Sequence, residues 1–398
     1  MKTNAVSMIS FSCLLFSGNF GAAQTWMQTG APSNYWTSIA ASADGSKLTG
    51  VGNNVCYSST NSGTTWTSNN VPAFGNGTLL TASADGMHLV AATDNTGEID
   101  ASTNGGLNWK KSTNYFEAAW TSLASSGDGK NVVLTEAAPL VRASTNWGAT
   151  WYPLVALPLC NICSESPQYA TISADGHCLT IAGPGNIFTT TNFGNTWTTN
   201  NLSTPWREMA ASADGKKLIT APYGANIYTS TNSGSTWIEQ TNSPDLLWWS
   251  CASSADGTKL AAISGTAGGT GVIYTSADSG ATWVSNSVPS QQWHQIVSSA
   301  DGNKLFAIVN GNDPVAAGGI WTLQTIPSPQ LNLSPSNGDL NFSWTVPSTN
   351  FILQQSPGLG PNNWTSPTNL PALNLSNLQE QLTLTPTNAS GFFRLVSQ

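Results

Sequence analysis

The sequence predicts an all-β fold made of repeated units. A turn containing Asp-Gly recurs seven times at intervals of 39 to 47 residues, with its aspartates at Asp44, Asp85, Asp128, Asp175, Asp214, Asp256 and Asp301. Short alternating apolar runs flank each turn, and this is a strong hairpin signal because glycine adopts positive φ without steric cost. Such a period accommodates four short strands, which is one propeller blade. We therefore predict a seven-bladed β-propeller over residues 24–326.

The first repeat shows how the strands follow one another. Its four predicted strands are residues 36–42, 47–51, 55–59 and 65–67. The seventh repeat breaks off after Trp321 without a fourth strand, whereas residues 24–32 resemble residues 64–72. We expect the N-terminal strand to complete the last blade, because this closes the ring and removes an exposed sheet edge.

Both ends of the chain differ from the repeats. Residues 1–23 have the pattern of an export signal, with Lys2, an apolar stretch over 6–16 and a small-residue cleavage site at 21–23. This pattern predicts an exported bacterial protein, either secreted or on the cell surface. No later stretch has the roughly 18 to 20 apolar residues of a membrane-spanning helix. Residues 327–398 alternate as half-buried strands do, and they predict a small C-terminal β-sandwich.

Composition narrows the classes of partner. Charged residues make up 8% of the chain, against a usual value of about 25%. The net charge is -8, and most lysines lie beside the repeated turn, so they are spread around the ring. Nucleic-acid binding needs clustered cations and is not expected. The surface suits polar, neutral partners, and we expect a monomer without cofactors. The three histidines, His88, His177 and His294, are too dispersed to predict a metal site.

Five cysteines follow the predicted signal, so at least one is unpaired. In an exported protein a disulfide between Cys160 and Cys163, or between either of these and Cys178, is plausible. Cys56 and Cys251 occupy strand positions that other repeats fill with apolar residues, which predicts buried thiols.

A second motif marks the hairpin between the third and fourth strands. It reads Ser-Thr-Asn-Ser-Gly-Thr-Thr-Trp over 59–66, and it recurs at 102–109, 144–151, 190–197, 230–237 and 276–283. This motif resembles the Asp-box, or BNR repeat, of sialidases, of the photosystem assembly factor family and of several secreted glycan-active propellers. The acidic position is occupied by Asn61, Asn104, Asn146, Asn192, Asn232 and Asp278. The structure of the turn explains these residues, because the Asn or Asp side chain accepts hydrogen bonds from backbone amides of the turn and the tryptophan packs between sheets.

The resemblance to sialidases does not extend to their catalytic residues. A sialidase holds its substrate with three arginines, but the predicted propeller contains only Arg142 and Arg207. Arg142 also aligns with ordinary strand positions such as Tyr57 and Tyr228. We therefore predict no catalytic residue. A glycoside hydrolase that uses a loop carboxylate pair remains the alternative; candidate pairs are Asp94 with Glu136 and Glu117 with Glu165.

The most informative candidates are aromatic. Five repeats begin their first strand with tryptophan, at Trp36, Trp120, Trp206, Trp248 and Trp293. Such rings could stack on sugars or pack between blades. Trp249 is unique to its repeat and is therefore a better ligand candidate, together with Arg207 and His294; Trp206 and Trp293 complete the predicted binding set.

These features favour a non-catalytic propeller that binds a glycan or a protein partner. An assembly factor is a third possibility, but it would need a charged docking surface, which the sequence lacks.

Overall fold

The structure is a computed structural model of the 398-residue chain. It describes residues 12–13, 26–52, 54–69, 74, 77–93, 96–113, 119–136, 140–154, 169–183, 185–201, 206–265, 270–289, 291–309, 318–324, 331–336, 339–345, 351–357, 364–374, 379–385 and 392–397. All regular secondary structure in these residues is β-strand, which confirms the predicted all-β class. No helix able to cross a membrane occurs in the described parts of the chain.

The chain forms two units, and the larger one contains seven groups of four strands among its described residues. Sheet 1 consists of β3 (Ser38–Ala41), β4 (Leu48–Gly52), β5 (Val55–Ser59) and β6 (Thr67–Asn69). Sheet 2 consists of β7 (Thr78–Ala82), β8 (Leu89–Thr93), β9 (Ile99–Ser102) and β10 (Lys110–Lys111). Sheet 3 consists of β11 (Trp120–Ser125), β12 (Val132–Glu136), β13 (Val141–Ser144) and β14 (Tyr152–Pro153).

Sheets 4 to 7 repeat this arrangement. Sheet 4 consists of β15 (Tyr169–Ile172), β16 (Leu179–Gly183), β17 (Asn186–Thr190) and β18 (Thr198–Asn201). Sheet 5 consists of β19 (Trp206–Ala211), β20 (Leu218–Ala225), β21 (Tyr228–Ser230) and β22 (Ile238–Glu239). Sheet 6 consists of β23 (Leu246–Ser253), β24 (Leu260–Ser264), β25 (Ile273–Ser276) and β26 (Val284–Ser285), and the pairing of β20 with β23 joins sheets 5 and 6 into one eight-stranded sheet. Sheet 7 consists of β27 (Trp293–Ser298), β28 (Lys304–Val309), β29 (Ile320–Gln324) and β2 (Met27–Gln28).

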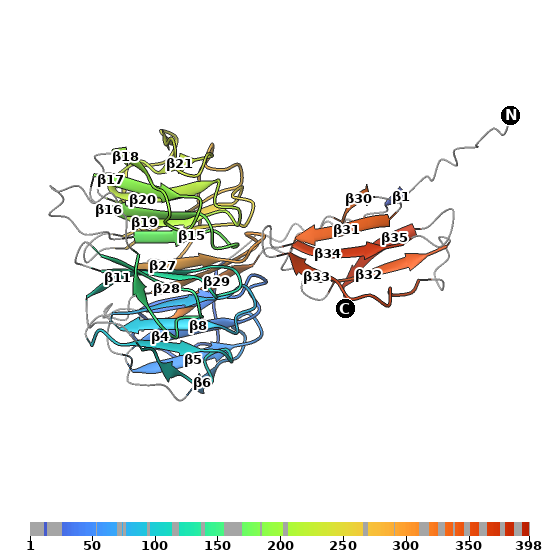
Figure 1. The fold of residues 1–398 in the computed structure, drawn as a ribbon, viewed down its shortest axis with the longest axis horizontal. Helices are drawn as coiled ribbons and strands as arrows, with labels where there is room; N and C mark the ends of the chain where they lie inside the picture. Colours follow the sequence, from blue (N-terminus) through green and yellow to red (C-terminus); the bar gives the residue numbers. More distant parts are fainter. Residues whose placement is uncertain are drawn as a thin grey trace. The chain divides into compact units, whose positions relative to one another are not determined.

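The last sheet takes its fourth strand from the start of the chain. Met27 of β2 pairs with Thr322 of β29, and Gln28 pairs with Trp321. Figure 1 shows the sheets following one another in chain order, from blue through green and yellow to orange. The first strands of neighbouring sheets contact one another, and β27 contacts β3, so the arrangement closes on itself.

The turns between the first and second strands, which we call the inner turns, hold this ring together. In each turn the residue before the repeated aspartate donates its backbone N–H to the equivalent carbonyl of the next sheet, over 2.6 to 2.8 Å. The series runs through Ala43, Ala84, Gly127, Ala174, Ala213, Ala255 and Ala300 and then returns to Ala43. Because these positions must approach backbone to backbone, only alanine and glycine occur there.

An apolar core lies between each pair of neighbouring sheets within the described residues, including sheets 7 and 1. Between sheets 7 and 1, for example, Phe306 and Ile320 pack against Trp36 and Leu48, and all four side chains are buried. Both faces of the second strands are covered, so β4, β8, β12, β16 and β24 are buried along their whole length.

The cysteines of the larger unit follow this packing. Cys56 and Cys251 are buried free thiols, and burial raises the pKa of Cys56 to about 12. Cys178 is also free, whereas Cys160 and Cys163 lie outside the described residues.

The smaller unit contains two sheets around one core. The first sheet has the order β30 (Asn332–Ser336), β31 (Asp339–Thr345), β34 (Gln379–Leu384) and β33 (Ala372–Asn374). The second has the order β1 (Ser12–Cys13), β35 (Phe392–Ser397) and β32 (Phe351–Ser356). Phe342 of β31 and Phe393 of β35 lie with their ring centres 4.5 Å apart. Strand β1 belongs to the segment that the sequence predicts to be an export signal.

Candidate functional site

The first strands of four sheets carry a β-bulge near their start. The register shifts lie between Trp120 and Ser122, Trp206 and Glu208, Trp248 and Ser250, and Trp293 and Gln295. A bulge places two residues opposite one and turns a side chain away from the regular alternation. The extra residues are Thr121, Arg207, Trp249 and His294. Three of the predicted ligand-binding residues therefore occupy equivalent bulge positions.

The tryptophans that precede these bulges are buried. Trp206 is 4% exposed and contacts Tyr228 and Trp237, while Trp293 is 1% exposed and contacts Trp26 and Trp321. Because protein covers both rings, we do not include Trp206 and Trp293 in the candidate site. Their contacts are those expected of rings that pack between neighbouring sheets.

Arg207 lies close to two aromatic side chains. Its guanidinium carbon is 4.1 Å from the centre of the Trp249 ring and 5.0 Å from the centre of the Tyr223 ring. The guanidinium also donates a hydrogen bond to the phenol of Tyr169. A cation over an aromatic face is stabilised by about 0.5 to 2 kcal/mol, depending on its exposure. Arg207, Trp249, Tyr223 and Tyr169 come from sheets 4, 5 and 6, and we call them the Arg207 cluster.

Two backbone features position the cluster. Strand β20 is longer than the second strands of most other sheets, and its end pairs with β23, so that Tyr223 lies opposite Leu247. On β23, Trp249 lies against Gly265, where an added Cβ would stand 3.1 Å from the indole Cδ1. Glycine at position 265 therefore provides the space that the indole occupies.

Glu208 follows Arg207 and accepts hydrogen bonds from the Ser250 hydroxyl and the Cys251 backbone. Burial raises the pKa of the Glu208 carboxyl to about 7, although these two hydrogen bonds lower it. Sheet 7 has an equivalent contact, in which the Gln295 side chain accepts a hydrogen bond of 2.9 Å from the Ile39 N–H. Glu208 is therefore part of the contacts between neighbouring sheets, with an acidic group where other sheets have neutral ones.

His294 lies apart from the Arg207 cluster in its contacts. Burial lowers the pKa of His294, while a hydrogen bond to the Thr37 backbone raises it. That contact joins sheets 7 and 1, whereas the Arg207 cluster belongs to sheets 4, 5 and 6. The structure thus brings Arg207 and Trp249 together and leaves His294 with another partner.

The turns between the third and fourth strands, which we call the outer turns, have the same geometry in six sheets. The Asn61 side-chain oxygen accepts hydrogen bonds from the Ser59 hydroxyl and the Thr65 N–H. The Asp278 carboxylate accepts the equivalent hydrogen bonds from the Ser276 hydroxyl and the Thr282 N–H. The same pair of contacts forms at Asn104, Asn146, Asn192 and Asn232. These side chains are engaged in holding their own turns.

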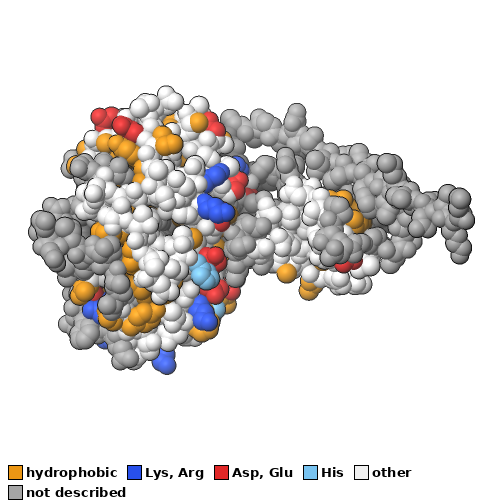
Figure 2. All heavy atoms as spheres, turned by 45° about the horizontal axis from the view of Figure 1, so that its top comes forward, with side chains coloured by type: hydrophobic (Ala, Val, Ile, Leu, Met, Phe, Trp, Pro, Cys, Tyr) orange, Lys and Arg blue, Asp and Glu red, His pale blue; other side chains and the backbone are white. Residues whose placement is uncertain are grey.

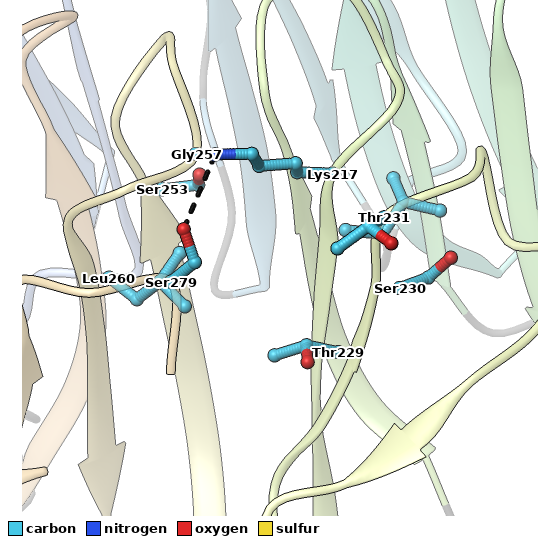
Figure 3. Close-up of a pocket in the computed structure, with 9 residues that line it drawn as sticks. Lys217, Thr229, Ser230, Thr231, Ser253, Gly257, Leu260 and Ser279 are labelled. Carbon is cyan, nitrogen blue, oxygen red and sulfur yellow. Dashed lines mark hydrogen bonds between the residues drawn. The ribbon is translucent and has the colours of Figure 1, made fainter. Parts of the chain in front are cut away.

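A small pocket lies between sheets 5 and 6 beside the inner turns. Its volume is about 10 Å³, which is room for one water molecule. Figure 3 shows Lys217 reaching across it, and the Lys217 ammonium donates to the Ser279 hydroxyl over 3.3 Å. The pocket is too small for a sugar ring, so we do not place a ligand there.

The carboxylates proposed for a hydrolase are not gathered in a described site. Glu136 forms an ion pair with Arg142, and both side chains are buried. Asp94, Glu117 and Glu165 lie outside the described residues. Within the described residues, no three His, Cys, Asp or Glu side chains are grouped as a metal ion would require.

Sequence reasoning named Arg207 and Trp249 but missed Tyr223 and Tyr169. Tyr223 lies at the end of an unusually long second strand, and that length depends on pairing with the next sheet. Tyr169 fills the strand position that is serine in sheets 1, 3 and 6, and this difference was a usable signal.

Comparison with known proteins identifies the fold. No protein family matches the sequence, and no curated protein matches it. Similar solved structures include YCF48 bound to D1 peptide (15% identity, TM-score 0.56, covering 80% of this chain and 100% of that one). The Cps50 (Swd1) β-propeller domain of Myceliophteria thermophila is 12% identical (TM-score 0.60, 76% and 100%). The GH74 xyloglucanase of Xanthomonas campestris is 13% identical (TM-score 0.57, 81% and 60%). These likenesses show a β-propeller fold.

Proposed function

We propose that this chain is an exported seven-bladed β-propeller that binds a glycan without catalysis. Seven inter-sheet cores and the closed series of inner-turn hydrogen bonds support seven blades. The two sheets and single core of the smaller unit support a C-terminal β-sandwich. Cleavage after residue 23 would remove β1 from that unit, and N-terminal sequencing of the exported protein tests this step.

The Arg207 cluster carries the binding proposal. It contains a guanidinium held by two aromatic rings, in a unit whose surface has few charges. Figure 2 shows mostly uncharged side chains on the visible face, with many of the basic (Lys or Arg), acidic and His side chains gathered in one band. Aromatic rings and hydrogen-bond donors at one place suit the apolar faces and hydroxyl groups of sugars.

The absence of catalysis is part of the proposal. Glycoside hydrolysis uses two carboxyl groups flanking the scissile bond. Glu136 is occupied by its ion pair with Arg142, and Glu208 is occupied by hydrogen bonds to the next sheet. We expect incubation with any bound glycan to leave it intact, and release of reducing ends would show a hydrolase instead.

A protein partner is the second candidate function. It is favoured by the likeness to YCF48, a structure of which contains a D1 peptide. At 15% identity this likeness shows the fold alone, so the peptide provides a hypothesis to test.

A glycan array probed with the mature, full-length protein tests the proposal. Arg207→Ala and Trp249→Ala should lose selective binding, because the first removes the guanidinium and the second removes its support. Arg394→Ala is a matched control, since Arg394 also lies 4.1 Å from a tryptophan ring, that of Trp364 in the smaller unit. Failure of the unmodified protein to bind any glycan would reject this function and direct attention to protein partners.

A further inference from the structure

Arg207 differs from the other arginines of the chain in its partners. The chain has three arginines. Arg142 is paired with Glu136, and Arg394 donates two hydrogen bonds, of 3.0 and 2.8 Å, to the Gln354 side-chain oxygen. Within the described residues Arg207 has no carboxylate within ion-pair distance. Its charge is therefore not neutralised by the described part of the protein.

The aromatic neighbours leave the hydrogen-bonding edge of this guanidinium for a ligand. A guanidinium has five N–H donors in its plane, and stacking on a ring uses the face of that plane. The Trp249 and Tyr223 ring centres lie 4.1 and 5.0 Å from the guanidinium carbon, and no hydrogen bond joins either side chain to Arg207 within the described residues. Tyr169 accepts one hydrogen bond. The remaining donors match the two oxygens of a carboxylate, which arginine binds in bidentate geometry.

The surrounding backbone argues against an added peptide strand as the source of that carboxylate. Peptides often bind by extending an exposed sheet edge. Beside Arg207 this edge is already used, because Tyr223 and Ala225 of β20 pair with Leu247 and Leu246 of β23. A sugar needs no backbone edge and binds through side chains.

We infer that Arg207 binds the carboxylate of an acidic sugar, so that the ligand is a glycan containing carboxylated sugar residues, of which uronic acids are the class tested. Trp249 and Tyr223 are positioning residues that fix the guanidinium plane. This inference rests on the proposed glycan-binding function and narrows it to one chemical class, in place of the neutral partners expected from the overall composition.

The test compares acids with their esters. Full-length mature protein is titrated with galacturonate, glucuronate and mannuronate oligosaccharides, each paired with its methyl ester, and with neutral oligosaccharides of the same length. We expect a uronate to bind at least about tenfold more tightly than its ester, which corresponds to the loss of one charge-assisted contact. Arg207→Ala should abolish this difference. Arg207→Lys should keep part of it, because the charge remains while the planar fork is lost.

Controls separate the possible failures. Arg394→Ala should bind like the unmodified protein, and thermal unfolding of each variant shows whether it is folded. If Arg207→Ala is unfolded, the comparison of acid with ester and the Arg207→Lys variant decide the question. Equal binding of acid and ester would overturn the inference and leave glycan binding intact. Binding to no oligosaccharide would reject the glycan function itself. Arg207-dependent binding of a peptide with a free carboxyl terminus, and of no uronate, would overturn the inference in favour of a protein partner.

Discussion

The two ends of the first strands differ in how strictly they repeat. At the inner turns every one of the seven sheets has the same serine, aspartate and glycine, and each turn hydrogen-bonds to the next. At the opposite end the bulge residue changes from Thr121 to Arg207, Trp249 and His294 in different blades. Residues that every pair of neighbouring sheets needs for its contacts are the same throughout the ring. Residues that vary from sheet to sheet are not required for closing the ring. We therefore propose that a ligand binds at the variable end.

The largest expected effect concerns Trp293, at a position that holds tryptophan in five of the seven repeats. Trp293→Ala should lower the free energy of unfolding by about 3 to 5 kcal/mol, because it empties a buried site between Trp26 and Trp321. Chemical denaturation measures this loss. His294→Ala, one residue further along, is the control and should cost less. A stable Trp293→Ala protein that had lost its ligand would place Trp293 in the binding site instead.

The second prediction uses Glu208, an acidic residue at a position that other blades fill with neutral side chains. Its pKa in the folded protein is about 7, which is above the ordinary value of 4.5. The folded state therefore holds a proton that the unfolded state has lost, so stability falls as the pH rises from 4.5 through 7. Glu208→Gln should remove this dependence and raise the free energy of unfolding at pH 8 by about 2 to 3 kcal/mol. Urea denaturation from pH 4 to pH 8 measures it.

Sheet 7 provides the reverse experiment. Gln295 accepts the equivalent hydrogen bond from Ile39, so Gln295→Glu should introduce a similar loss of stability above neutral pH. If Glu208→Gln changed stability equally at pH 4 and pH 8, titration of Glu208 would not be the cause.

A third, smaller effect is expected at the uniform end. The Asp44 carboxylate accepts hydrogen bonds from the Ser42 hydroxyl and from the Ser46 N–H and hydroxyl, over 2.5 to 2.9 Å. Burial raises the pKa of Asp44, but these hydrogen bonds bring it below its usual value. Asp44→Ala should destabilise the protein by about 1 to 2 kcal/mol and leave glycan binding unchanged. Asp44→Asn keeps an acceptor and is the control; equal losses in both variants would point to charge rather than to the turn.

The uniform features were predictable from sequence because each recurs at a fixed place in every repeat. The inner-turn aspartates predicted the strands around them, and residues 24–32 predicted the strand that pairs with β29. Trp206 and Trp293 show the limit of this reasoning, since a repeated tryptophan suits both sugar stacking and packing. Each ring is buried by side chains that lie far from it in the sequence, such as Tyr228 beside Trp206 and Trp321 beside Trp293. Only the fold brings these residues together.

The Arg207 cluster was predictable only in part. Arg207 and Trp249 stood out because they are unlike their counterparts in other repeats. Their stacking depends on bulges in two strands, and the place of Tyr223 depends on the pairing of β20 with β23. Such irregularities arise from the register between strands. The sequence of one repeat does not predict its register with the next repeat.

The smallest effect tests the substitution of asparagine for aspartate in the outer turns. The Asn61 oxygen and the Asp278 carboxylate accept the same two hydrogen bonds, so the turn needs an acceptor and not a charge. Asn61→Asp and Asp278→Asn should each change the free energy of unfolding by less than about 0.5 kcal/mol. Asn61→Ala should cost more, about 1 kcal/mol, because it leaves the Thr65 N–H without its partner. A large loss in Asp278→Asn alone would mean that this one carboxylate has a role beyond its turn, and would move the search for function to the outer turn of sheet 6.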